Sequence, residues 1–570
     1  MIKATGAQII TGILERKCIK TVAGIPGGSI LPLYDELAKS SIKHILVRQE
    51  QAGGFIAQGI ARTTGKAAVC FATSGPGAMN LLTAIADARS DSIPLVAITG
   101  QVNRALIGTD AFQETDTFGL SMPICKHSVM VKSAAELLKV LPEAFRIAES
   151  GRQGPVIVDV PRDVQLETCS FQQWPDMKDY EWKPSAPANL DALVSVAVDL
   201  FAKARRIVLF CGGGAVYSEG APQLIQQLSE KYRIPVCTSL MGLTVVPAQN
   251  PLCLGMVGMH GSYTANRVMY ESDLIIALGI RFDDRATGTV SKFCPNAKII
   301  HIDVDAAEIN KIYQSSVAIP CDCATALKLF AKKLESDVCV KAAQESAAFW
   351  EKLIPECGRK MCGIYEETLF HPSVFMKRIE RLCAKLFKKP PYITTDVGQH
   401  QMFTAQCYPM SFPRQLLTSG SLGTMGFGLP AAIGAALANP DHRIICFSGD
   451  GSILMNVQEL ATLYELGLKV TVIVLDNQCL GMVRQQQELI FNRNYSASIY
   501  EKTTDLCAVA EGFHIPSFDI TDEDGFDEKL TKALSAKGPS FVRIPVKQEY
   551  NVLPFVFSGK ANIEAFGLKN

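Results

Sequence analysis

The 570-residue sequence lacks an excess of charge of either sign. Lys and Arg together number 56, as do Asp and Glu, so the formal net charge at pH 7 is zero. Proteins that bind nucleic acids or membrane surfaces through bulk charge carry a basic excess or a basic patch. The balanced composition argues against both classes, and we expect neither a nucleic acid nor a membrane as a partner.

Long apolar runs are also missing. No stretch reaches the roughly 18–20 apolar residues that a membrane-spanning helix needs. The opening MIKATGAQIITGILERKCIK contains the acidic Glu15 and no small-residue cleavage site, so it predicts an amphipathic helix rather than a signal peptide. We therefore expect a cytoplasmic protein.

The cysteines lack the close pairing of a disulfide framework or a zinc site. Most of the 18 stand singly, many of them inside apolar runs such as AAVCFA and IICFSG. Only Cys321 and Cys323 are close together, and one such pair without a second is a weak sign of a metal site. We interpret the cysteines as reduced thiols that pack as small apolar side chains.

What the sequence does contain is a regular alternation of short apolar runs with helical periodicity. Runs such as AAVCFATSG, RIVLFCGGG, RIICFSGDG and KVTVIVLDN end in Gly, Ser, Asp or Asn and precede helical segments, which is typical of parallel α/β units. Two segments break this rhythm, one rich in proline and charge and one helical and polar. The prediction is an α/β protein with three doubly wound parallel-sheet domains. The expected parts are 1–165, a linker 166–188, 189–332, a helical linker 333–369, 370–548, and a tail 549–570.

Two polar strand ends in the third domain indicate a metal site. The segment RIICFSGDGSILMNVQELATLYELGLKVTVIVLDNQ predicts one βαβ unit, with a helix over about 455–466 that Gly467 can end. Asp450 follows the first strand and Asn477, 27 positions later, the second. Parallel neighbours end at the same edge of a sheet, so the two side chains should converge. Their oxygens suit Mg²⁺. The alternative is a tight turn in which Asp450 only caps a helix.

GDG followed at this distance by a polar pair ending in Asn resembles the thiamine diphosphate motif, although Asp476 stands where that family usually has Asn. The resemblance implies that Asp450, Asn477 and the Cys479 main-chain carbonyl hold Mg²⁺, which in turn holds the diphosphate. Strand-to-helix loops of this domain supply the other implied cofactor positions. These are Gly398, Gln399, His400, Gly423, Met425, Gly449, Gly451 and Ser452.

Thiamine diphosphate also needs an acid. The cofactor loses its C2 proton through its own aminopyrimidine, and a carboxylic acid bonded to the remote ring nitrogen favours the tautomer that accepts this proton. Glu50, directly after the strand HILV, is the candidate. A lone Glu after a strand is more often a solvated charge at a helix start. Here the loops 24–35 and 73–80 flank it in the sequence and supply further candidate cofactor residues, namely Pro26, Gly27, Pro76 and Asn80.

Eight motifs extend the resemblance over nearly the whole chain. They are GIPGGSILPLYD, RQEQAGGFIAQG, SGPGAMNLLTAIADA, GTDAFQETD, GMVGMHG, GIRFDDRATG, VGQHQM and LGMVRQ. Together they resemble the catalytic large subunits of the acetohydroxyacid (acetolactate) synthases. The resemblance implies a transferase that decarboxylates pyruvate and transfers the hydroxyethyl unit to pyruvate or 2-ketobutyrate, in branched-chain amino-acid biosynthesis.

The same resemblance implies partners. Glu50 and Asp450 would meet across two subunits, so we expect a homodimer or a dimer of dimers. A separate small subunit would carry feedback regulation by branched-chain amino acids.

A third cofactor, FAD, is implied for the middle domain, where it would be retained without net redox chemistry. RIVLFCGGG resembles the start of a dinucleotide-binding unit but lacks a complete GxGxxG fingerprint. The flavin candidates are Gly212, Gly213, Gly214, Met259, His260, Gly279, Arg281 and Asp303.

Three residues are candidates for contact with the reacting ketoacids. The resemblance places Gly28 and Gln113 at the reaction centre, where an N–H or amide donor can stabilise a developing oxyanion; the commoner fate of such a Gln is a solvated loop position. Arg285 would bind a substrate carboxylate through paired hydrogen bonds. Its alternative is an ion pair with Asp283 or Asp284.

Acceptor choice is assigned to the segment after the metal site. Met482, Val483 and Gln486 are the candidate substrate contacts, and Gln486 stands where most of the family has Trp. An indole favours the larger acceptor by apolar contact. We therefore predict only a weak preference for 2-ketobutyrate, as in the type I bacterial isozyme.

Other functions remain open from the sequence. One is a non-catalytic nucleotide-binding regulator, which would not need Glu50. Others are a catabolic acetolactate synthase, a glyoxylate carboligase, or a 2-ketoacid decarboxylase. The RFDDR pattern disfavours the catabolic synthase, and Glu50 disfavours the carboligase, which has an apolar residue there.

Overall fold

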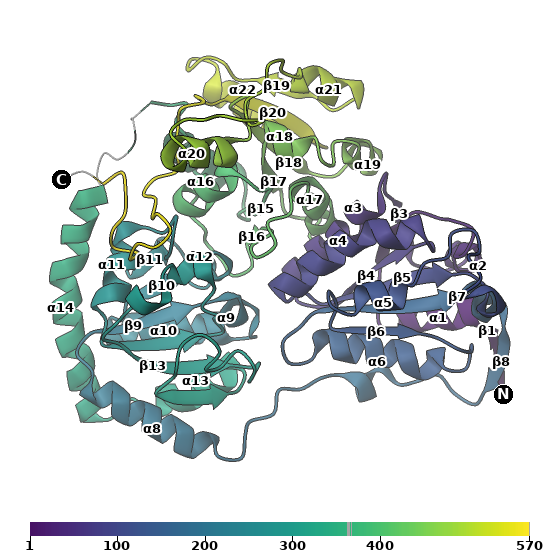
Figure 1. The fold of residues 1–570 in the computed structure, drawn as a ribbon, viewed down its shortest axis with the longest axis horizontal. Helices are drawn as coiled ribbons and strands as arrows, with labels where there is room; N and C mark the ends of the chain where they lie inside the picture. Colours follow the sequence, from purple (N-terminus) through teal and green to yellow (C-terminus); the bar gives the residue numbers. More distant parts are fainter. Residues whose placement is uncertain (362–364, 366–367, 569–570) are drawn as a thin grey trace.

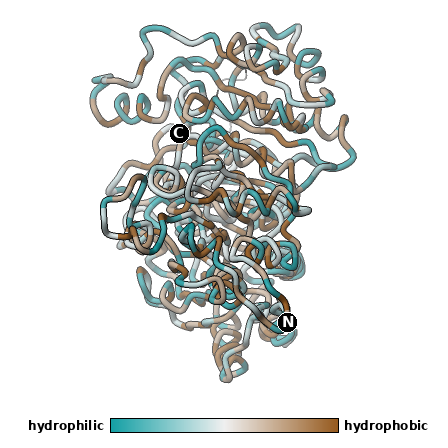
Figure 2. Tube along the Cα trace, turned by 90° about the vertical axis from the view of Figure 1, so that its right-hand side faces the viewer, coloured by the Kyte–Doolittle hydropathy of each residue, from teal (hydrophilic) through white to brown (hydrophobic). Residues whose placement is uncertain are grey.

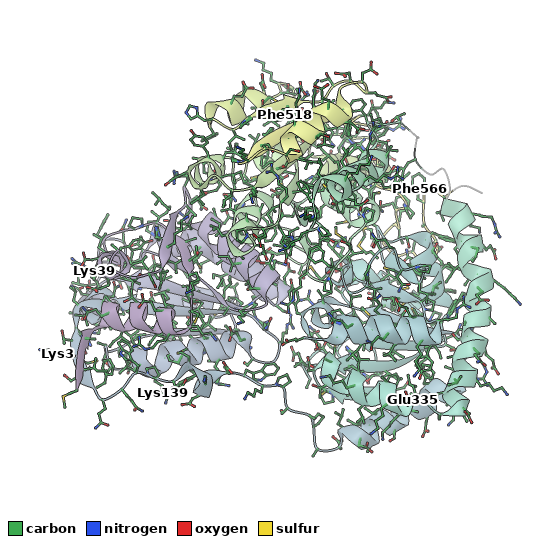
Figure 3. All side chains as sticks on the ribbon, turned by 180° about the vertical axis from the view of Figure 1, so that it is seen from behind. Lys3, Lys39, Lys139, Glu335, Phe518 and Phe566 are labelled. Carbon is green, nitrogen blue, oxygen red and sulfur yellow. The ribbon has the colours of Figure 1, made fainter. Side chains whose placement is uncertain are left out.

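The computed structural model describes residues 1–361, 365 and 368–568. Three six-stranded sheets, each flanked by helices, form three α/β bodies around a common centre (Figure 1). Lys3, Lys39 and Lys139 lie on the outer side of the N-terminal body, Glu335 on the central one and Phe518 on the C-terminal one (Figure 3). Hydrophilic and hydrophobic segments alternate along the whole trace (Figure 2). These observations confirm the predicted α/β class.

The N-terminal sheet has the strand order β3-β2-β4-β5-β7-β6, and all neighbouring strands within it are parallel. Its strands are β2 (Thr21–Gly24), β3 (Lys43–Leu46), β4 (Ala68–Ala72), β5 (Leu95–Gln101), β6 (His127–Met130) and β7 (Pro155–Pro161). The helices are α1 (Gly6–Arg16), α2 (Leu31–Leu37), α3 (Glu50–Thr64), α4 (Pro76–Asp91), α5 (Thr117–Ser121), α6 (Leu137–Glu149) and α7 (Arg162–Leu166), with a 3₁₀ turn at Arg104–Leu106.

The expected helix at the start of the chain is only partly correct. Residues Ile2–Thr5 form strand β1, which pairs antiparallel with β8 (Thr168–Phe171), and the helix α1 begins at Gly6. Thr5 caps α1 with a capping box that includes Gln8, so the cap residues fix the helix start after the strand. The pairing brings part of the expected linker 166–188 into a two-stranded sheet, and a 3₁₀ turn follows at Met177–Tyr180.

The central sheet has the order β11-β10-β9-β12-β13-β14, which is the 3-2-1-4-5-6 order of dinucleotide-binding folds. Its strands are β9 (Ile207–Cys211), β10 (Val236–Thr238), β11 (Cys253–Met256), β12 (Leu274–Leu278), β13 (Lys298–Asp303) and β14 (Val317–Pro320). The helices are α8 (Leu190–Lys203), α9 (Gly213–Tyr217), α10 (Ala221–Tyr232), α11 (Tyr263–Glu271), α12 (Asp284–Thr287), α13 (Cys323–Lys333) and α14 (Asp337–Met361), with 3₁₀ turns at Leu240–Gly242 and Val290–Lys292. The expected division into domains stays a prediction in its exact boundaries.

The C-terminal sheet has the order β16-β15-β17-β18-β20-β19. Its strands are β15 (Tyr392–Thr395), β16 (Leu416–Leu417), β17 (Ile444–Gly449), β18 (Val470–Asp476), β19 (Ser517–Asp519) and β20 (Ser540–Pro545). The helices are α15 (Pro372–Leu386), α16 (Gln399–Cys407), α17 (Gly428–Ala438), α18 (Asp450–Ile453), α19 (Glu459–Leu466), α20 (Gly481–Ile490), α21 (Leu506–Gly512) and α22 (Phe526–Leu534). Numbered within each body, the N- and C-terminal sheets share the order 2-1-3-4-6-5, so the two bodies are topological relatives.

Two helices, α18 and α19, lie between β17 and β18, and the helix expected over about 455–466 corresponds to the second, which begins at Glu459. The first begins directly at Asp450, at the end of β17, and the second ends at Gly467, which adopts the left-handed conformation of a helix C-cap at φ 59°. The short α18 turns the chain away at the strand end, so the Asp450 side chain stays at the edge of the sheet.

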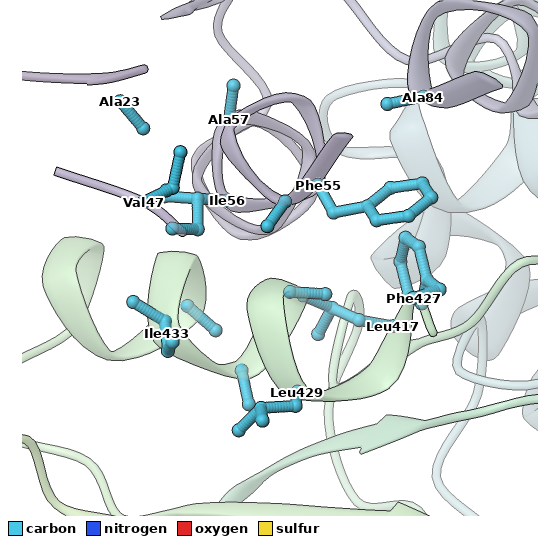
Figure 4. Packing of buried hydrophobic residues seen from close by; sticks show 14 of the residues in the cluster. Ala23, Val47, Phe55, Ile56, Ala57, Ala84, Leu417, Phe427, Leu429 and Ile433 are labelled. Atoms are coloured by element: carbon cyan, nitrogen blue, oxygen red, sulfur yellow. The ribbon is translucent and has the colours of Figure 1, made fainter. Parts of the chain in front are cut away.

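Helices α3 and α17 join the N- and C-terminal bodies. Their facing side chains, among them Phe55, Ile56, Phe427 and Ile433, belong to one buried cluster (Figure 4). Phe55 and Phe427 meet edge to face, with ring centroids 5.3 Å apart. The sheets of both bodies therefore share a core, which sets the positions of their strand ends relative to each other.

Candidate active site

Asp450 and Asn477 lie at the ends of neighbouring parallel strands, as predicted. Strand β17 pairs with β18 in a register that places Gly449 opposite Leu475. Asp450 follows Gly449 directly and is only 7% exposed. Its Oδ2 atom is buried without a hydrogen-bond partner among the described residues. An orphaned buried carboxylate oxygen is costly unless a ligand completes it.

A second carboxylate beside Asp450 makes the binding of a cation more favourable. Burial and the adjacent Asp476 carboxylate raise the pKa of Asp450 to about 8. Asp476 is itself held by Arg543, whose Nε lies 2.5 Å from its Oδ2. A divalent cation would favour the ionised form of Asp450 and stabilise the two neighbouring acids. The donor set therefore fits Mg²⁺, which needs few protein ligands beside phosphate and water.

Gln399 orients the amide of Asn477. The Asn477 Nδ2 group donates to Gln399 Oε1 at 3.1 Å, and Gln399 Nε2 donates to Gln485 Oε1 and to the Tyr550 carbonyl, both at 2.9 Å. With its nitrogen engaged in this way, Asn477 keeps its Oδ1 atom as an acceptor for a ligand. The Gln399 side chain thus orients the Asn477 amide, and its predicted contact with a diphosphate stays a prediction.

Glycines allow side chains and backbone to pack closely beside the Asp450 strand end. A Cβ at position 449 would lie 2.8 Å from His400 Nδ1, and one at 451 would collide with the Tyr500 hydroxyl. Gly398 has φ 149° and precedes α16, which begins at Gln399. Backbone N–H groups and the positive end of a helix dipole can therefore approach a bound phosphate.

Two buried histidines that line the cavity, His400 and His260, are neutral. Burial lowers the pKa of His400 to about 3 and that of His260 to about 4. Both imidazoles are thus available as uncharged hydrogen-bonding groups at neutral pH.

A cavity of about 1290 Å³ connects the C-terminal strand ends with the central sheet. It brings together all the predicted metal, diphosphate, flavin and acceptor residues. They are Gly212, Gly213, Gly214, Met259, His260, Gly279, Arg281, Arg285, Asp303, Gly398, Gln399, His400, Gly423, Met425, Gly449, Asp450, Gly451, Ser452, Asn477, Cys479, Met482, Val483 and Gln486.

The predicted N-terminal residues form a separate cluster. Asn80 Nδ2 donates to Glu50 Oε2 at 3.0 Å, and a Cβ at Gly77 would lie 3.3 Å from Glu50 Oε1. Gly75, at φ 59°, lies against the Gln113 backbone. Of the residues that the structure describes, neither these nor Pro26, Gly27, Gly28 and Pro76 line the large cavity. One chain therefore does not unite Glu50 with Asp450.

The substrate candidates differ in their surroundings. The Arg285 side chain is 70% exposed, and its Nε lies 3.7 Å from Asp284 Oδ2, a long and solvated ion pair. Asp283 is engaged as the N-cap of α12. Since the guanidinium is only weakly paired, it is available to an incoming carboxylate. Gln486 is exposed at the cavity wall.

Two features of the site were not predicted from the sequence. Asp396 is buried and accepts hydrogen bonds from the N–H groups of Gly426 and Gly428, at 2.7 and 3.3 Å, and burial raises its pKa to about 7. Asp396 directly precedes the motif VGQHQM and follows the β-rich run YITT, so its position at a predicted strand end could have marked it as a site residue. Arg152 pairs with Glu308 at 2.5 Å across two bodies, for which the sequence offers no signal.

The cysteines and the apolar helices behave as the composition predicted. Every cysteine in the described ranges is unpaired. Within those same ranges, no helix is both long and apolar enough to cross a membrane.

Three protein-family models match the chain. They are the N-terminal TPP binding domain, the central domain and the C-terminal TPP binding domain of the thiamine pyrophosphate enzymes, over residues 4–120, 194–330 and 396–544. Each span lies within one of the three bodies of the structure, although the first ends before β6 and β7 of the N-terminal body.

Curated relatives match over nearly the full length. The acetolactate synthase isozyme 1 large subunit of Escherichia coli is 47% identical over 567 residues, covering 99% of this chain and 98% of the relative. A large subunit from Parasynechococcus marenigrum is 42% identical over 99% of this chain and 91% of the relative. The isozyme 2 large subunit of E. coli is 41% identical over 98% of both chains. The chain belongs to the acetolactate synthase large subunits, a family of thiamine pyrophosphate enzymes.

Proposed function

We propose that this protein is a biosynthetic acetolactate synthase, which decarboxylates pyruvate and transfers the hydroxyethyl unit to a second 2-ketoacid. The observation that carries the proposal is the pair of the buried Asp450 and the half-buried Asn477, which faces the same cavity as the acceptor and flavin candidates. A non-catalytic regulator would have no use for an orphaned carboxylate that shares a cavity with an exposed, weakly paired Arg285.

The C-terminal body would hold the cofactor end of the site. Asp450, Asn477 and the Cys479 carbonyl would bind Mg²⁺, and backbone groups near Gly398, Gly449 and Gly451 would bind the diphosphate. When bound, thiamine diphosphate supplies a stabilised carbanion equivalent for the carbon–carbon bond. The chain's own task there is to fix the metal and exclude water.

The N-terminal body would supply the acid. Glu50, already bonded to Asn80, would hold a proton at the pyrimidine ring nitrogen and so keep the amine opposite in its basic form. Gly28 and Gln113 would lie beside the reacting carbonyl, where donors can stabilise an oxyanion.

A second copy of the chain would complete the site. Glu50 and Asp450 face different regions of one chain, so an isologous dimer is required for them to meet. The exposed Met79, Phe112 and Met122 of the N-terminal body, 52%, 89% and 61% exposed, offer an apolar surface for that contact.

FAD would occupy the central part of the cavity. The 3-2-1-4-5-6 strand order and the Gly212–Gly214 turn at the end of β9 are the features of a dinucleotide site. Met259, His260, Gly279, Arg281 and Asp303 would surround the flavin.

Arg285 would receive the carboxylate of the acceptor, and Met482, Val483 and Gln486 would contact its alkyl end. Because Gln486 offers less apolar surface than an indole, we propose little discrimination between pyruvate and 2-ketobutyrate. A separate small subunit would confer feedback regulation, since the relatives are named as large subunits.

The test uses purified protein with thiamine diphosphate, Mg²⁺ and FAD. We expect CO₂ release from pyruvate, acetolactate as the product, and a flavin absorption spectrum. With both ketoacids competing, the two products should form in similar yield per unit of substrate. Release of CO₂ without acetolactate would favour a decarboxylase, and a colourless active enzyme would favour the catabolic synthase. Added small subunit should raise activity and confer valine sensitivity.

A further inference from the structure

The three bodies meet at the segment 419–425, which connects β16 to α17. Gly420, Ser421, Leu422, Gly423 and Met425 line the large cavity. This 419–425 loop therefore forms part of the wall against which a cofactor would bind. Its backbone conformation is held by side chains of the N-terminal and central bodies.

Two carboxylates of α4 hold this loop. Asp91 Oδ2 accepts the N–H of Gly420 and Asp91 Oδ1 that of Ser421, both at 2.9 Å. Asp87 Oδ1 accepts the hydroxyl groups of Ser419 and Thr424, the latter at 2.9 Å. These bonds join residues more than 300 positions apart, and they fix both ends of the loop.

A buried arginine completes the arrangement. Arg62 of α3 is 1% exposed, and its Nη2 lies 2.8 Å from Asp91 Oδ2 and 3.5 Å from Asp87 Oδ2. Its guanidinium also stacks on Phe427, 5.0 Å from the ring centroid, directly after the loop. We call Arg62, Asp87 and Asp91 the Arg62 cluster.

The Arg62 cluster is a poor means of stabilising the fold alone. One guanidinium faces two carboxylates in a dry interior, and apolar side chains of similar volume usually serve stability as well. Burial and the Asp91 charge raise the pKa of Asp87, which shows the electrostatic cost. The charged groups instead fix the geometry of the loop, because carboxylate oxygens hold backbone N–H groups at defined angles.

The central body contacts the same loop. Arg281 Nη1 donates to the Ser90 carbonyl at 2.7 Å, and its Nη2 donates to the Ser421 hydroxyl. Asp87 and Asp91 of the N-terminal body and Arg281 of the central body therefore all hold the loop by hydrogen bonds.

We infer that Arg62, Asp87 and Asp91 are positioning residues, which hold the 419–425 loop in the shape that binds thiamine diphosphate. They act through the loop positions Gly423 and Met425. Asp91 also reaches the cavity wall, whereas Arg62 and Asp87 do not line the cavity. This inference rests on the proposed function. Its consequence is that weakening the cluster should loosen cofactor binding before it unfolds the protein.

The experiment measures the Kd of thiamine diphosphate by titration calorimetry at saturating Mg²⁺ and FAD. Asp91→Asn exchanges an acceptor of a backbone N–H for a donor, and Asp87→Asn weakens the hydroxyl contacts. We expect each to raise the Kd about tenfold, as the loss of one charge-assisted hydrogen bond allows. The apparent KM for the cofactor should rise likewise, while kcat at saturating cofactor stays within about threefold, because the loop closes once the cofactor is bound.

Two controls separate positioning from general stability. Glu149→Gln neutralises the half-buried partner of Lys17, which lies 2.8 Å away in the same body, and Glu149 has no hydrogen bond to the loop. This variant should lower Tm comparably and leave the Kd within about twofold. Thr424→Val removes the loop side of one contact, so its effect and that of Asp87→Asn should be non-additive in a double-mutant cycle.

The inference is overturned if Asp91→Asn binds thiamine diphosphate as tightly as the parent at a temperature where both are folded. Additivity of Thr424→Val with Asp87→Asn would also overturn it. If the unmodified protein fails to bind thiamine diphosphate at all, the proposed function itself has failed, and this outcome is distinct from the other two.

Discussion

At the scale of single residues, Asp450 is the proposed anionic ligand of the metal. Its buried Oδ2 needs a partner, and Asp476 lies next to it. Asp450→Asn would remove the anionic ligand and keep the shape. Removal of an outer-shell partner alone costs about 10–100-fold in metal affinity, so loss of this ligand should cost more. Calorimetry with Mg²⁺ and thiamine diphosphate checks this; unchanged affinity would place the metal elsewhere.

Gln486 is the residue that should decide acceptor choice. It is exposed at the wall of the cavity, close in sequence to Met482 and Val483. Gln486→Trp should raise the ratio of 2-ketobutyrate to pyruvate products by about tenfold, because an indole supplies the apolar contact that one methylene can exploit. Competition assays measure the ratio. Gln486→Leu is the matched control for polarity without ring size, and an unchanged ratio in the Trp variant would refute the assignment.

Asp159 should make stability depend on pH. It accepts from Thr99 Oγ1 at 2.6 Å and from Gln101 Nε2 at 3.1 Å, and burial raises its pKa to about 7. In the unfolded chain an Asp titrates near the ordinary value of about 4. The folded state therefore binds the Asp159 proton more tightly than the unfolded chain does. The stabilisation that this proton gives the fold is complete below about pH 4 and is lost as pH rises to about 7.

Asp159→Asn carries no such proton. The stability of the variant relative to the parent should therefore improve as pH rises from 4 to 7, by up to about 1.4 kcal/mol per pH unit. Urea unfolding of both proteins at several pH values gives the difference. A difference that stays flat with pH would show that Asp159 is ionised in the fold.

At the scale of elements, the crossing of α3 and α17 depends on two glycines. A Cβ at Gly59 would collide with the Ala431 carbonyl, and one at Gly434 with the Ile56 carbonyl. Such close approach of backbones is what joins the N- and C-terminal bodies (Figure 4). Neither position has an unusual φ, so the requirement is for space alone.

Gly59→Ala should therefore destabilise the protein by about 1–3 kcal/mol, the usual range for overpacking. Thermal unfolding provides the measurement. Gly358→Ala in α14 is the control, because a Cβ there meets nothing within 4 Å, and it should be neutral or stabilising by up to about 1 kcal/mol. Equal effects of the two substitutions would contradict the close packing.

At the scale of the whole molecule, the separation of Glu50 from the large cavity makes a prediction about assembly. Glu50→Gln and Asp450→Asn should each be inactive. Mixing them under conditions that exchange subunits should restore about a quarter of the parent activity, because half of the dimers are mixed and each has one intact site. Acetolactate formation after exchange is the assay. No recovery, with exchange shown by mass, would mean that each site is built within one chain.

Local patterns in the sequence predicted much of this protein. The apolar runs and their polar ends predicted parallel sheets, and the spacing of Asp450 and Asn477 predicted adjacent strand ends, because the geometry of a βαβ unit is local. The start of the chain was mistaken for helix because the partner of β1 is β8, more than 160 residues away. Pairing across such a distance leaves no local signal.

The three α/β bodies, the neighbouring strand ends that carry Asp450 and Asn477, and the family could all be read from the sequence, since each depends on residues close in the chain or on motifs. That the flavin, metal and acceptor candidates share one cavity, and that Glu50 lies outside it, required the folded structure. It alone revealed that Gln399 orients Asn477 and that Arg62, Asp87 and Asp91 hold the 419–425 loop. The physical reason is that these contacts depend on how three bodies pack together, and packing is set by side chains hundreds of positions apart.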